Sequence, residues 1–462
     1  MKTYAVPQKE LEVRFSADVV ICGGGTAGVS AAMAAADQGA SVIIIEQFGS
    51  LGGTATNGLV TPYMHSGIAG DPDCSYTRKK IAEVMRELGG MEEDGRAFDP
   101  MTLRYACEKL CVEAGVKILF YHFITDVIKE GGRVKGVVAA TKSGSYVIEG
   151  KEFIDCTGDA DISVLAGAEY TKGDPDTGKC QPISLRYIVS GIDKKAFGEF
   201  IRSEAQRTGI DWGASYDGGD HVYAAVTGQG DWTFGDAFDK AVAAGDLDIE
   251  DKLYWQVFTI PGRKDALAFN NPEFFEDVDG TDVLHLTRTQ LEGKRRIFRQ
   301  LAFYKKYLKG FENAYISEIA PMVGVRESRN VIGKYTMTGV EMLGRAKFAD
   351  CFSQSNYPVD IHGKVLNCKE NVAPVDDGKP WYEIPFGTLV VKGFENLFVA
   401  GRCIGVDFLA ESSIRVQGSV RSSGEAAGIG AAIACKRNIG SYDIDGVEVR
   451  NIMIANGADF KE

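Results

Sequence analysis

The sequence has no run of apolar residues long enough to cross a bilayer, although 45% of its 462 residues are hydrophobic. A membrane-spanning helix needs about 20 consecutive apolar residues. The N-terminal stretch also lacks the apolar core and the cleavage site of a secretory signal peptide. We therefore expect a protein without a membrane span, located in the cytoplasm.

The sequence also has fewer basic than acidic residues. The chain has 51 Lys and Arg against 64 Asp and Glu, which gives a formal net charge of −13. Proteins bind nucleic acid backbones through clusters of basic side chains. The acidic balance therefore argues against a nucleic acid partner, and it is compatible with a small-molecule substrate.

The ten cysteines are scattered and form no C-x-x-C pair. Cys107 and Cys111 would share one face of a helix, but no second pair is present to complete a metal site. A redox-active pair with four intervening residues is absent too. We therefore predict reduced thiols, no metal ion and no disulfide chemistry.

Glycine is abundant, with 55 residues, and three glycines organise the N-terminal region. Gly23, Gly25 and Gly28 match the pattern G-x-G-x-x-G between an apolar run and a helix expected over 29–38. A second apolar run then ends in Glu46. The glycines allow a tight turn, the approach of a pyrophosphate and close helix packing, while the acid accepts hydrogen bonds from a ribose. This order predicts a dinucleotide-binding site; a glycine turn in an ordinary α/β fold is the alternative.

The rest of the chain divides into segments of different character. Hydrophobic spacing predicts helices over 76–88, 100–115, 291–308 and 413–434, and strands over 116–120, 134–140, 146–148, 153–154, 183–189, 253–260 and 396–401. Alternation over 124–156 is typical of a β-meander. Polar loops dominate after residue 171. Near residue 380 the sequence again resembles the N-terminal region, with a strand that ends on glycine and a helix of small residues. We predict a nucleotide-binding domain made of 1–170 and 376–462, interrupted by a substrate domain over 171–375.

Five stretches make the chain resemble the FAD-dependent oxidoreductases of bacteria, in the group that includes fumarate reductase and succinate dehydrogenase flavoproteins. They are CGGGTAG at 22–28, LGGTATNG at 51–58, IDCTGDAD at 154–161, GVRESR at 324–329, and the long stretch 382–420. The resemblance implies an α/β fold: a Rossmann-type FAD-binding domain, with a parallel sheet and a β-meander, interrupted by a mostly β (α+β) substrate domain. It also implies FAD bound without a covalent link.

The resemblance assigns FAD contacts residue by residue. The pyrophosphate turn corresponds to Gly23, Gly25, Thr26, Ala27 and Gly28, and the ribose acid and its neighbour to Glu46 and Gln47. The loop that leads onto the flavin corresponds to Gly52, Gly53, Thr54 and Ala55, the adenine clamp to Val127, and the adenosine turn to Thr157, Gly158 and Asp161. The flavin end corresponds to Gly401, Arg402, Asp407, Arg415, Val416 and Gln417. Many relatives carry Gly-Asp where this chain has Gly-Arg, and the nearest following acid is Asp407.

Three side chains are candidates for the chemistry. His362 has an acid–base range that suits proton transfer; a structural histidine in a loop is the alternative. His65 follows the loop onto the flavin, and some relatives tether FAD to a histidine downstream of this loop, although that motif is not evident here. Arg326, beside Glu327 and Arg329, would bind an anionic group or belong to a salt-bridge network between the domains.

These observations predict an FAD-dependent oxidoreductase that transfers hydride between flavin N5 and a polar small molecule, anionic or hydroxylated. The electron donor or acceptor is unknown, and a homo-oligomer is compatible with the sequence. A C=C reductase similar to fumarate reductase and a flavoprotein subunit that relays electrons to a partner both remain open. A second glycine motif for NAD(P) and the signature of aromatic hydroxylases are absent, which argues against glutathione-reductase-like enzymes and against monooxygenases.

Overall fold

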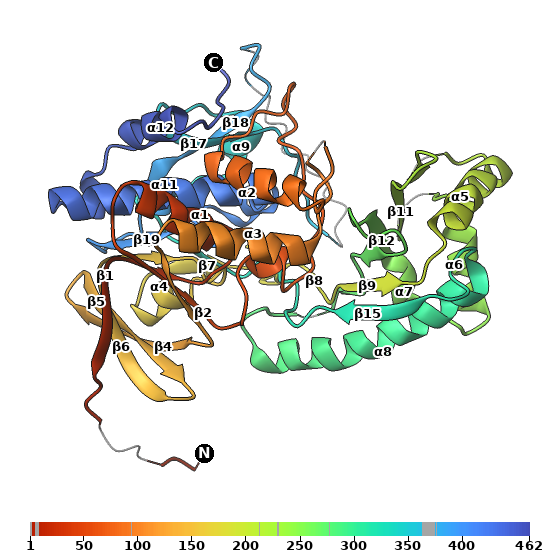
Figure 1. Cartoon of the computed structure of the whole chain (residues 1–462), viewed down its shortest axis with the longest axis horizontal. Helices are drawn as coiled ribbons and strands as arrows, with labels where there is room; N and C mark the ends of the chain where they lie inside the picture. Colours follow the sequence, from red (N-terminus) through yellow and green to blue (C-terminus); the bar gives the residue numbers. More distant parts are fainter. Residues whose placement is uncertain are drawn as a thin grey trace.

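The computed structural model describes residues 2–4, 9–93, 95–211, 213–228, 231–276, 278–362, 375 and 377–462. The chain forms a larger body, which carries both termini, and a smaller body beside it (Figure 1). A seven-stranded sheet lies in the larger body and a six-stranded sheet in the smaller one. The chain has the α/β fold of Rossmann type that the sequence predicts.

The larger sheet is mostly parallel. Its order is β3 (Lys117–Phe120), β2 (Val42–Glu46), β1 (Val13–Cys22), β6 (Gly144–Asp155), β5 (Arg133–Thr141) and β4 (Phe123–Glu130), and β19 (Leu397–Val399) also pairs with β6. β1 pairs in parallel with β2 and β6, whereas β4, β5 and β6 form an antiparallel meander. The carboxyl ends of β1, β2 and β6 therefore lie at one edge, where ligands of such sheets bind.

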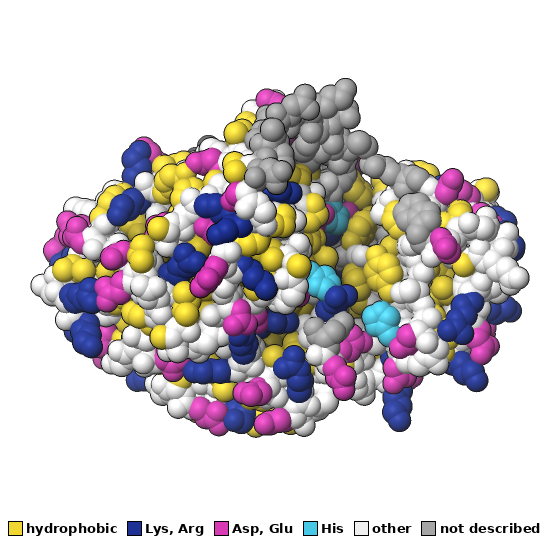
Figure 2. All heavy atoms as spheres, turned by 90° about the horizontal axis from the view of Figure 1, so that it is seen from above, with side chains coloured by type: hydrophobic (Ala, Val, Ile, Leu, Met, Phe, Trp, Pro, Cys, Tyr) yellow, Lys and Arg dark blue, Asp and Glu magenta, His cyan; other side chains and the backbone are white. Residues whose placement is uncertain are grey.

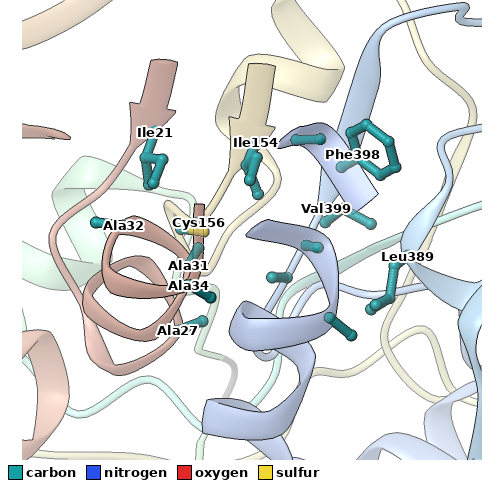
Figure 3. Close-up of a cluster of buried hydrophobic side chains, with 14 of the residues drawn as sticks. Ile21, Ala27, Ala31, Ala32, Ala34, Ile154, Cys156, Leu389, Phe398 and Val399 are labelled. Carbon is teal, nitrogen blue, oxygen red and sulfur yellow. The ribbon is translucent and has the colours of Figure 1, made fainter. Parts of the chain in front are cut away.

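Two helices of small residues pack against each other and against this sheet. α1 (Thr26–Asp37) and α11 (Gln417–Arg437) approach so closely that a Cβ on Gly424 would lie 2.1 Å from the carbonyl oxygen of Ala27. Figure 3 shows the alanines of α1 packed with Ile21, Ile154 and Val399 of the strands. Only residues without bulk at these positions let the last helix of the chain reach the first.

The remaining helices cover the two bodies. In the larger body they are α2 (Tyr76–Glu87), α3 (Pro100–Glu113), α4 (Asp161–Leu165), α9 (Gly339–Leu343), α10 (Phe408–Ile414) and α12 (Gly446–Ala455), with 3-10 turns η1 (Gly53–Ala55), η2 (Phe386–Leu389) and η3 (Ser441–Asp443). In the smaller body they are α5 (Lys194–Thr208), α6 (Gly235–Ala243), α7 (Glu250–Leu253) and α8 (Val283–Tyr307). None of the helices in the described residues is both long and apolar enough to cross a membrane.

The smaller sheet is antiparallel and has its own core. Its order is β10 (Ala214–Tyr216), β11 (Val222–Thr227), β12 (Tyr254–Thr259), β13 (Leu267–Phe269), β9 (Tyr187–Ser190) and β15 (Tyr315–Ile319). Trp255, Phe269 and Tyr304 are almost fully buried between this sheet and α8. Three short ladders complete the fold: β8 (Ile183–Ser184) with β14 (Glu273–Phe274), β7 (Tyr170–Lys172) with β16 (Arg329–Val331), and β17 (Cys351–Ser355) with β18 (Tyr382–Pro385).

Several predicted elements differ in the structure. The strands predicted at 146–148 and 153–154 are one strand, β6, because its first half pairs with β5 and its second half continues along β1. The helix predicted over 413–434 is two helices, α10 and α11, which break between Ile414 and Gln417. The helix predicted over 291–308 begins earlier, at Val283, where Asp282 accepts a hydrogen bond from the N–H of Leu284. The domain boundaries at 170 and 375 stay predictions.

Candidate functional site

A cavity of about 960 Å³ lies along the carboxyl edge of the larger sheet and reaches the smaller body. Its walls include Gly25, Glu46 and Gly401 on one side and Arg186 and Gln256 on the other. Figure 2 shows the surface hollowed between the two bodies, with histidine and apolar side chains around the hollow. The volume is at the upper end of the range for ligand pockets, about 300–1,000 Å³, so it has room for a large ligand.

The glycine turn forms one end of this cavity. Gly23 has φ +104°, and a Cβ on Gly28 would lie 2.0 Å from the carbonyl oxygen of Gly23, so both positions require glycine. Gly23, Gly25, Thr26 and Ala27 line the cavity, whereas Gly28 is packed against the turn. No side chain caps the first turn of α1. Its unpaired N–H groups therefore form an anion site at the helix N-terminus.

A second glycine loop lies directly against the first. The N–H of Gly52 donates to the carbonyl oxygen of Gly24 over 2.8 Å. A Cβ on Gly53 would lie 2.7 Å from Cα of Gly25. Gly53 and Thr54 line the cavity, while Gly52 and Ala55 lie behind them and hold the loop. The two loops together make a cradle of backbone that no side chain obstructs.

Glu46 lies at the end of β2 and is 5% exposed. Its two carboxylate oxygens accept the N–H groups of Gly24 and Phe48, each over 2.8 Å. Burial raises the pKa of Glu46, and these hydrogen bonds offset the rise only in part. Both Glu46 and Gln47 line the cavity. The backbone thus fixes the carboxylate at the place where the sequence predicts a ribose acid.

The end of the cavity near the meander differs in detail from the prediction. Val127 is half-buried against the core and does not line the cavity; Phe123, Ile124 and Thr125 do. Thr157, Gly158 and Asp161 line it as predicted for the adenosine turn. The cavity therefore meets β4 at Phe123 to Thr125, and the adenosine turn lines the same cavity.

Two carboxylates shape this adenosine turn. Both oxygens of Asp155 accept hydrogen bonds within the turn, one from Thr157 and one from Ser163. Burial, with smaller contributions from Asp159 and Asp155, raises the pKa of Asp161 to about 6. Arg329 pairs with Asp161 and limits that rise. Arg329 is therefore a partner of the turn, not a free cation in the cavity.

Arg402 ties three segments together beside the cavity. Its Nε donates to the carbonyl oxygen of Gly158 over 2.9 Å, and its two terminal nitrogens contact the carbonyl oxygen of Val325 and the carboxylate of Asp159. Gly401 and Arg402 line the cavity, but Asp407 does not. Asp407 instead caps α10 and accepts the N–H of Gly339. A basic residue here connects the turn after β6 to the segment that carries Arg326.

The break between α10 and α11 turns the start of α11 toward the cavity. Arg415, Val416 and Gln417 all line it. No side chain caps α11, and Gln417 donates from its amide to the carbonyl oxygens of Val60 and Pro62, over 3.1 Å each. The positive end of a long helix therefore faces the cavity, where it favours negative charge.

His362 lies on the wall opposite the glycine cradle. Its Nδ1 is 2.8 Å from Oε1 of Glu273, and its Nε2 is 3.4 Å from Oδ1 of Asp360. Burial and the neighbouring Arg326 lower the pKa of His362, whereas Glu273 and Asp360 raise it. Arg326 pairs with the same Glu273 and donates to the carbonyl oxygen of Pro182 over 2.9 Å. The structure thus brings the predicted His362 and Arg326 together around one buried carboxylate.

Two other predicted side chains lie elsewhere. His65 is beside the cavity but does not line it; its Nδ1 is 3.1 Å from Asp71, and its side chain is 38% exposed. Glu327 points away from the cavity and accepts the N–H groups of Gly173 and Gln181. Neither residue lines the cavity as His362 does.

Several residues of this wall were missed by the sequence analysis. They are Ser184, Arg186, Tyr223, Gln256, Asn270 and Glu273, all lining the cavity or buried next to it. The sequence does mark two of these residues. Arg186 interrupts an otherwise apolar strand pattern, and Glu273 follows a proline in a stretch with aromatic residues on both sides. A charged residue inside such a run points to a ligand or to a buried partner. In the described part of the chain, no group of three His, Cys, Asp or Glu side chains is placed to hold a metal ion.

A glycine cradle at the carboxyl ends of parallel strands, with an acid at the end of the second strand, defines a dinucleotide-binding protein of Rossmann type. The family of FAD dependent oxidoreductases matches residues 18–453. The chain belongs to this family; it is an FAD-dependent oxidoreductase, and FAD is its cofactor.

Individual proteins are more distant. The thiamine thiazole synthase of Methanococcus aeolicus is 33% identical over 175 residues, which is 35% of this chain and 61% of that protein. The thiamine thiazole synthase of Methanococcus vannielii is 29% identical over 163 residues, 32% of this chain and 58% of that protein. The chain thus spans less than two thirds of the length of these relatives.

Solved structures resemble the chain over most of its length. The p-nitrophenol 4-monooxygenase of Pseudomonas putida is 10% identical with a TM-score of 0.49, and the match covers 96% of this chain and 87% of that one. A geranylgeranyl bacteriochlorophyll reductase-like protein of Thermoplasma acidophilum is 12% identical with a TM-score of 0.48, covering 95% and 83%.

The cavity fits FAD. The uncapped N-terminus of α1 suits the pyrophosphate, and Glu46 holds its carboxylate rigidly at the cavity wall. The cavity then continues from β4 to the start of α11. The residues that line it and that the sequence assigned to FAD are Gly23, Gly25, Thr26, Ala27, Glu46, Gln47, Gly53, Thr54, Thr157, Gly158, Asp161, Gly401, Arg402, Arg415, Val416 and Gln417.

Proposed function

We propose that this oxidoreductase acts on a polar small molecule bound between the glycine cradle and the wall of Arg186, Arg326 and His362. FAD, when bound, supplies the two-electron chemistry, and the protein supplies placement and proton transfer. The observation that carries the proposal is a histidine with a side chain only 14% exposed, held by Glu273, in the same cavity as the dinucleotide cradle.

His362 serves as the acid–base group of this proposal. Donation of Nδ1–H to Glu273 leaves a lone pair on Nε2, which can accept the proton that a substrate hydroxyl releases on oxidation. Burial and Arg326 lower the pKa of His362, so the imidazole is ready to accept a proton at neutral pH. Glu273 and Asp360 lie on opposite sides of the ring and stabilise the resulting cation.

The start of α11 and the two glycine loops act on the cofactor. Val416 and Gln417 present the positive end of the helix to the cavity, which favours negative charge on a bound ring. The cradle around Gly25 and Gly53 holds the phosphates through backbone N–H groups. We further propose that FAD is held without a covalent bond, because His65 does not line the cavity; acid precipitation of the protein should leave all the flavin in the supernatant.

One observation favours a second function, reduction of an activated C=C bond, as in fumarate reductase relatives. Burial and the nearby Arg326 lower the pKa of Arg186 to about 9. An arginine with so low a pKa can donate a proton to a substrate carbon, and the remaining cations can orient the substrate. In that case His362 serves as a binding residue.

Anaerobic spectroscopy of the flavin separates these functions. We expect hydroxylated substrates to bleach the oxidised flavin, and His362→Gln to slow bleaching by about 100-fold or more. His221→Gln is the matched control, since His221 does not line the cavity, and it should bleach like the parent. Reoxidation of the chemically reduced enzyme by enoates, without bleaching by alcohols, would favour the reductase. Failure of both reactions, together with a stable protein complex, would favour an electron-relaying subunit.

A further inference from the structure

Three buried polar atoms on the wall opposite the cradle have no hydrogen-bond partner among the described residues. They are Oγ of Ser184, Nε of Arg186 and Oδ1 of Asn270. Each residue is at least nine-tenths buried, and each lines the cavity. A buried polar group without a partner costs about 1–3 kcal/mol, and native proteins leave few such groups unsatisfied. Three of them facing one cavity indicate the polar groups of a ligand.

The charges on this wall do not balance. Arg326 pairs with Glu273, and Arg415 lies 3.5 Å from Asp360 and 4.0 Å from Glu411. Burial raises the pKa of Glu411 to about 8, so this acid is mostly protonated at neutral pH and adds little negative charge. Arg186 has no carboxylate within salt-bridge distance among the described residues. A buried cation without a counter-charge is expensive, and an anion that enters the site offsets this cost. One negatively charged group of a ligand would therefore balance the net positive charge of this wall.

The surroundings favour a carboxylate over a phosphate. The planar guanidinium of Arg186 can bind both oxygens of a carboxylate in parallel. A dianion would meet only one uncompensated cation, with the carboxylates of Glu273 and Asp360 nearby. A monoanion carries the single negative charge that would balance the positive charge of Arg186.

Asn270 adds a second requirement. Its amide nitrogen donates to the hydroxyl of Tyr254 over 2.7 Å and to Oε1 of Gln256 over 2.9 Å. The amide nitrogen of Gln256 donates in turn to Tyr223 over 3.0 Å. This network orients the Asn270 amide and leaves Oδ1 as an acceptor. The ligand must therefore carry a donor, and a neutral amide oxygen suits a hydroxyl group, whereas an ammonium would seek a carboxylate.

We infer that the substrate is a small hydroxy acid, whose carboxylate binds Arg186 and whose hydroxyl, or a neighbouring one, donates to Asn270. The inference rests on the proposed function, in which this wall faces the cofactor, and it names the substrate class. Ser184 then donates its hydroxyl to the bound carboxylate. In this site Arg186 selects for a negative charge on the substrate, and Asn270 selects for a hydroxyl group.

Calorimetric titration of the FAD-loaded protein tests this inference directly. The probes are glycolate, lactate and mandelate, with acetate lacking the hydroxyl, glycolamide lacking the charge, and glycine carrying an ammonium. We expect at least one hydroxy acid to bind about tenfold more tightly than acetate, and glycolamide and glycine to bind no better than acetate. Equal binding of glycolamide and glycolate, or no saturable binding of any hydroxy acid, would overturn the inference.

Variants assign the two contacts. Arg186→Gln should weaken binding of the hydroxy acid by about 10–100-fold, and Arg186→Lys by less, because lysine keeps the charge and loses the fork. Asn270→Ala should reduce the affinity for the hydroxy acid to that for acetate. Arg299→Gln is the matched control, because Arg299 lies on α8, pairs with Asp251 of α7 and is absent from the cavity wall. Unchanged binding by a folded, FAD-loaded Arg186→Gln protein would contradict the assignment.

Binding and bleaching together separate this inference from the proposed function. Tight binding of hydroxy acids without bleaching would support the substrate site and argue against the proposed reaction. Bleaching by neutral alcohols alone would support the reaction and overturn the anionic substrate.

Discussion

His362 and Glu273 form a buried pair, with Nδ1 of the imidazole 2.8 Å from Oε1 of the carboxylate. Glu273 is 2% exposed and His362 reaches the cavity. They come from distant parts of the sequence: Glu273 belongs to β14, and His362 lies in the segment after β17. Arg326 contacts the same carboxylate, so one acid holds both the proposed proton acceptor and a cation of the substrate wall.

Replacing this acid should change the basicity of the histidine. Glu273→Gln removes the main group that raises the pKa of His362 and leaves burial and Arg326, which lower it. We therefore expect the pKa of His362 to fall further. Histidine-labelled NMR can follow this, because the chain has five histidines and His362→Gln assigns the signal. Asp360→Asn should cause a smaller fall, and Asp71→Asn, beside His65, none. A rise in the pKa of His362 in Glu273→Gln would refute the arrangement.

The packing of the glycine turn makes a second prediction. In Gly28→Ala the new Cβ would lie 2.0 Å from the carbonyl oxygen of Gly23, so the turn must shift. We expect the protein to lose FAD and about 1–3 kcal/mol of stability, measured as flavin content and urea unfolding. Gly235→Ala is the control, since nothing lies within 4 Å of its Cβ; it should keep FAD and stability.

Arg402 provides a third prediction. Its guanidinium joins Gly158, Asp159 and Val325, and Arg402→Met leaves these acceptors without a donor. We expect a loss of about 3 kcal/mol in the free energy of unfolding and faster release of FAD, with Arg402→Lys less affected. Arg207→Met, which breaks solvent-exposed salt bridges to Glu204 and Asp236, should cost much less than Arg402→Met. Equal costs for Arg402→Met and Arg207→Met would show that the tie at Gly158 contributes little.

A buried acid predicts a pH dependence of stability. Burial raises the pKa of Glu152 from 4.5 to about 8, and Arg133 offsets this only in part. The folded protein therefore keeps a proton that the unfolded chain releases, and stability from this group is present below pH 4.5 and lost as the pH rises toward 8.

Glu152→Gln abolishes this titration. We expect the variant to be more stable than the parent by about 1–3 kcal/mol at pH 8, with a difference that shrinks as the pH falls toward 4.5. Urea unfolding at several pH values measures it. Glu149→Gln, an exposed acid on the same strand, should show no such trend, and a gain for Glu152→Gln that is independent of pH would contradict the explanation.

The cofactor half of the site could be predicted from the sequence because its parts are local. Gly23, Gly25 and Glu46 lie within one strand–helix–strand unit, and their spacing follows from backbone geometry alone. Val127 and Asp407 show where this reasoning ends. Val127 belongs to the right strand, but the cavity meets that strand at Thr125. Asp407 is the nearest acid after Gly401, yet its carboxylate caps α10.

The substrate half could not be predicted in the same way. Arg186 precedes β9, Asn270 follows β13, Glu273 belongs to β14 and His362 follows β17. No spacing in the sequence relates them, since antiparallel pairing and the packing of the two bodies decide which of them meet. Arg326 and Arg329 both line the cavity but pair with different acids, Arg326 with Glu273 and Arg329 with Asp161.

The sequence by itself determined the dinucleotide cradle, the α/β fold and the class of cofactor, because short-range glycine geometry and strand periodicity encode them. Only the tertiary structure decided that His362 and Arg326 share Glu273 and that, among the residues the structure describes, no carboxylate forms a salt bridge with Arg186. Those relationships depend on long-range contacts, in which burial sets the cost of each charge and neighbouring side chains decide how that cost is met.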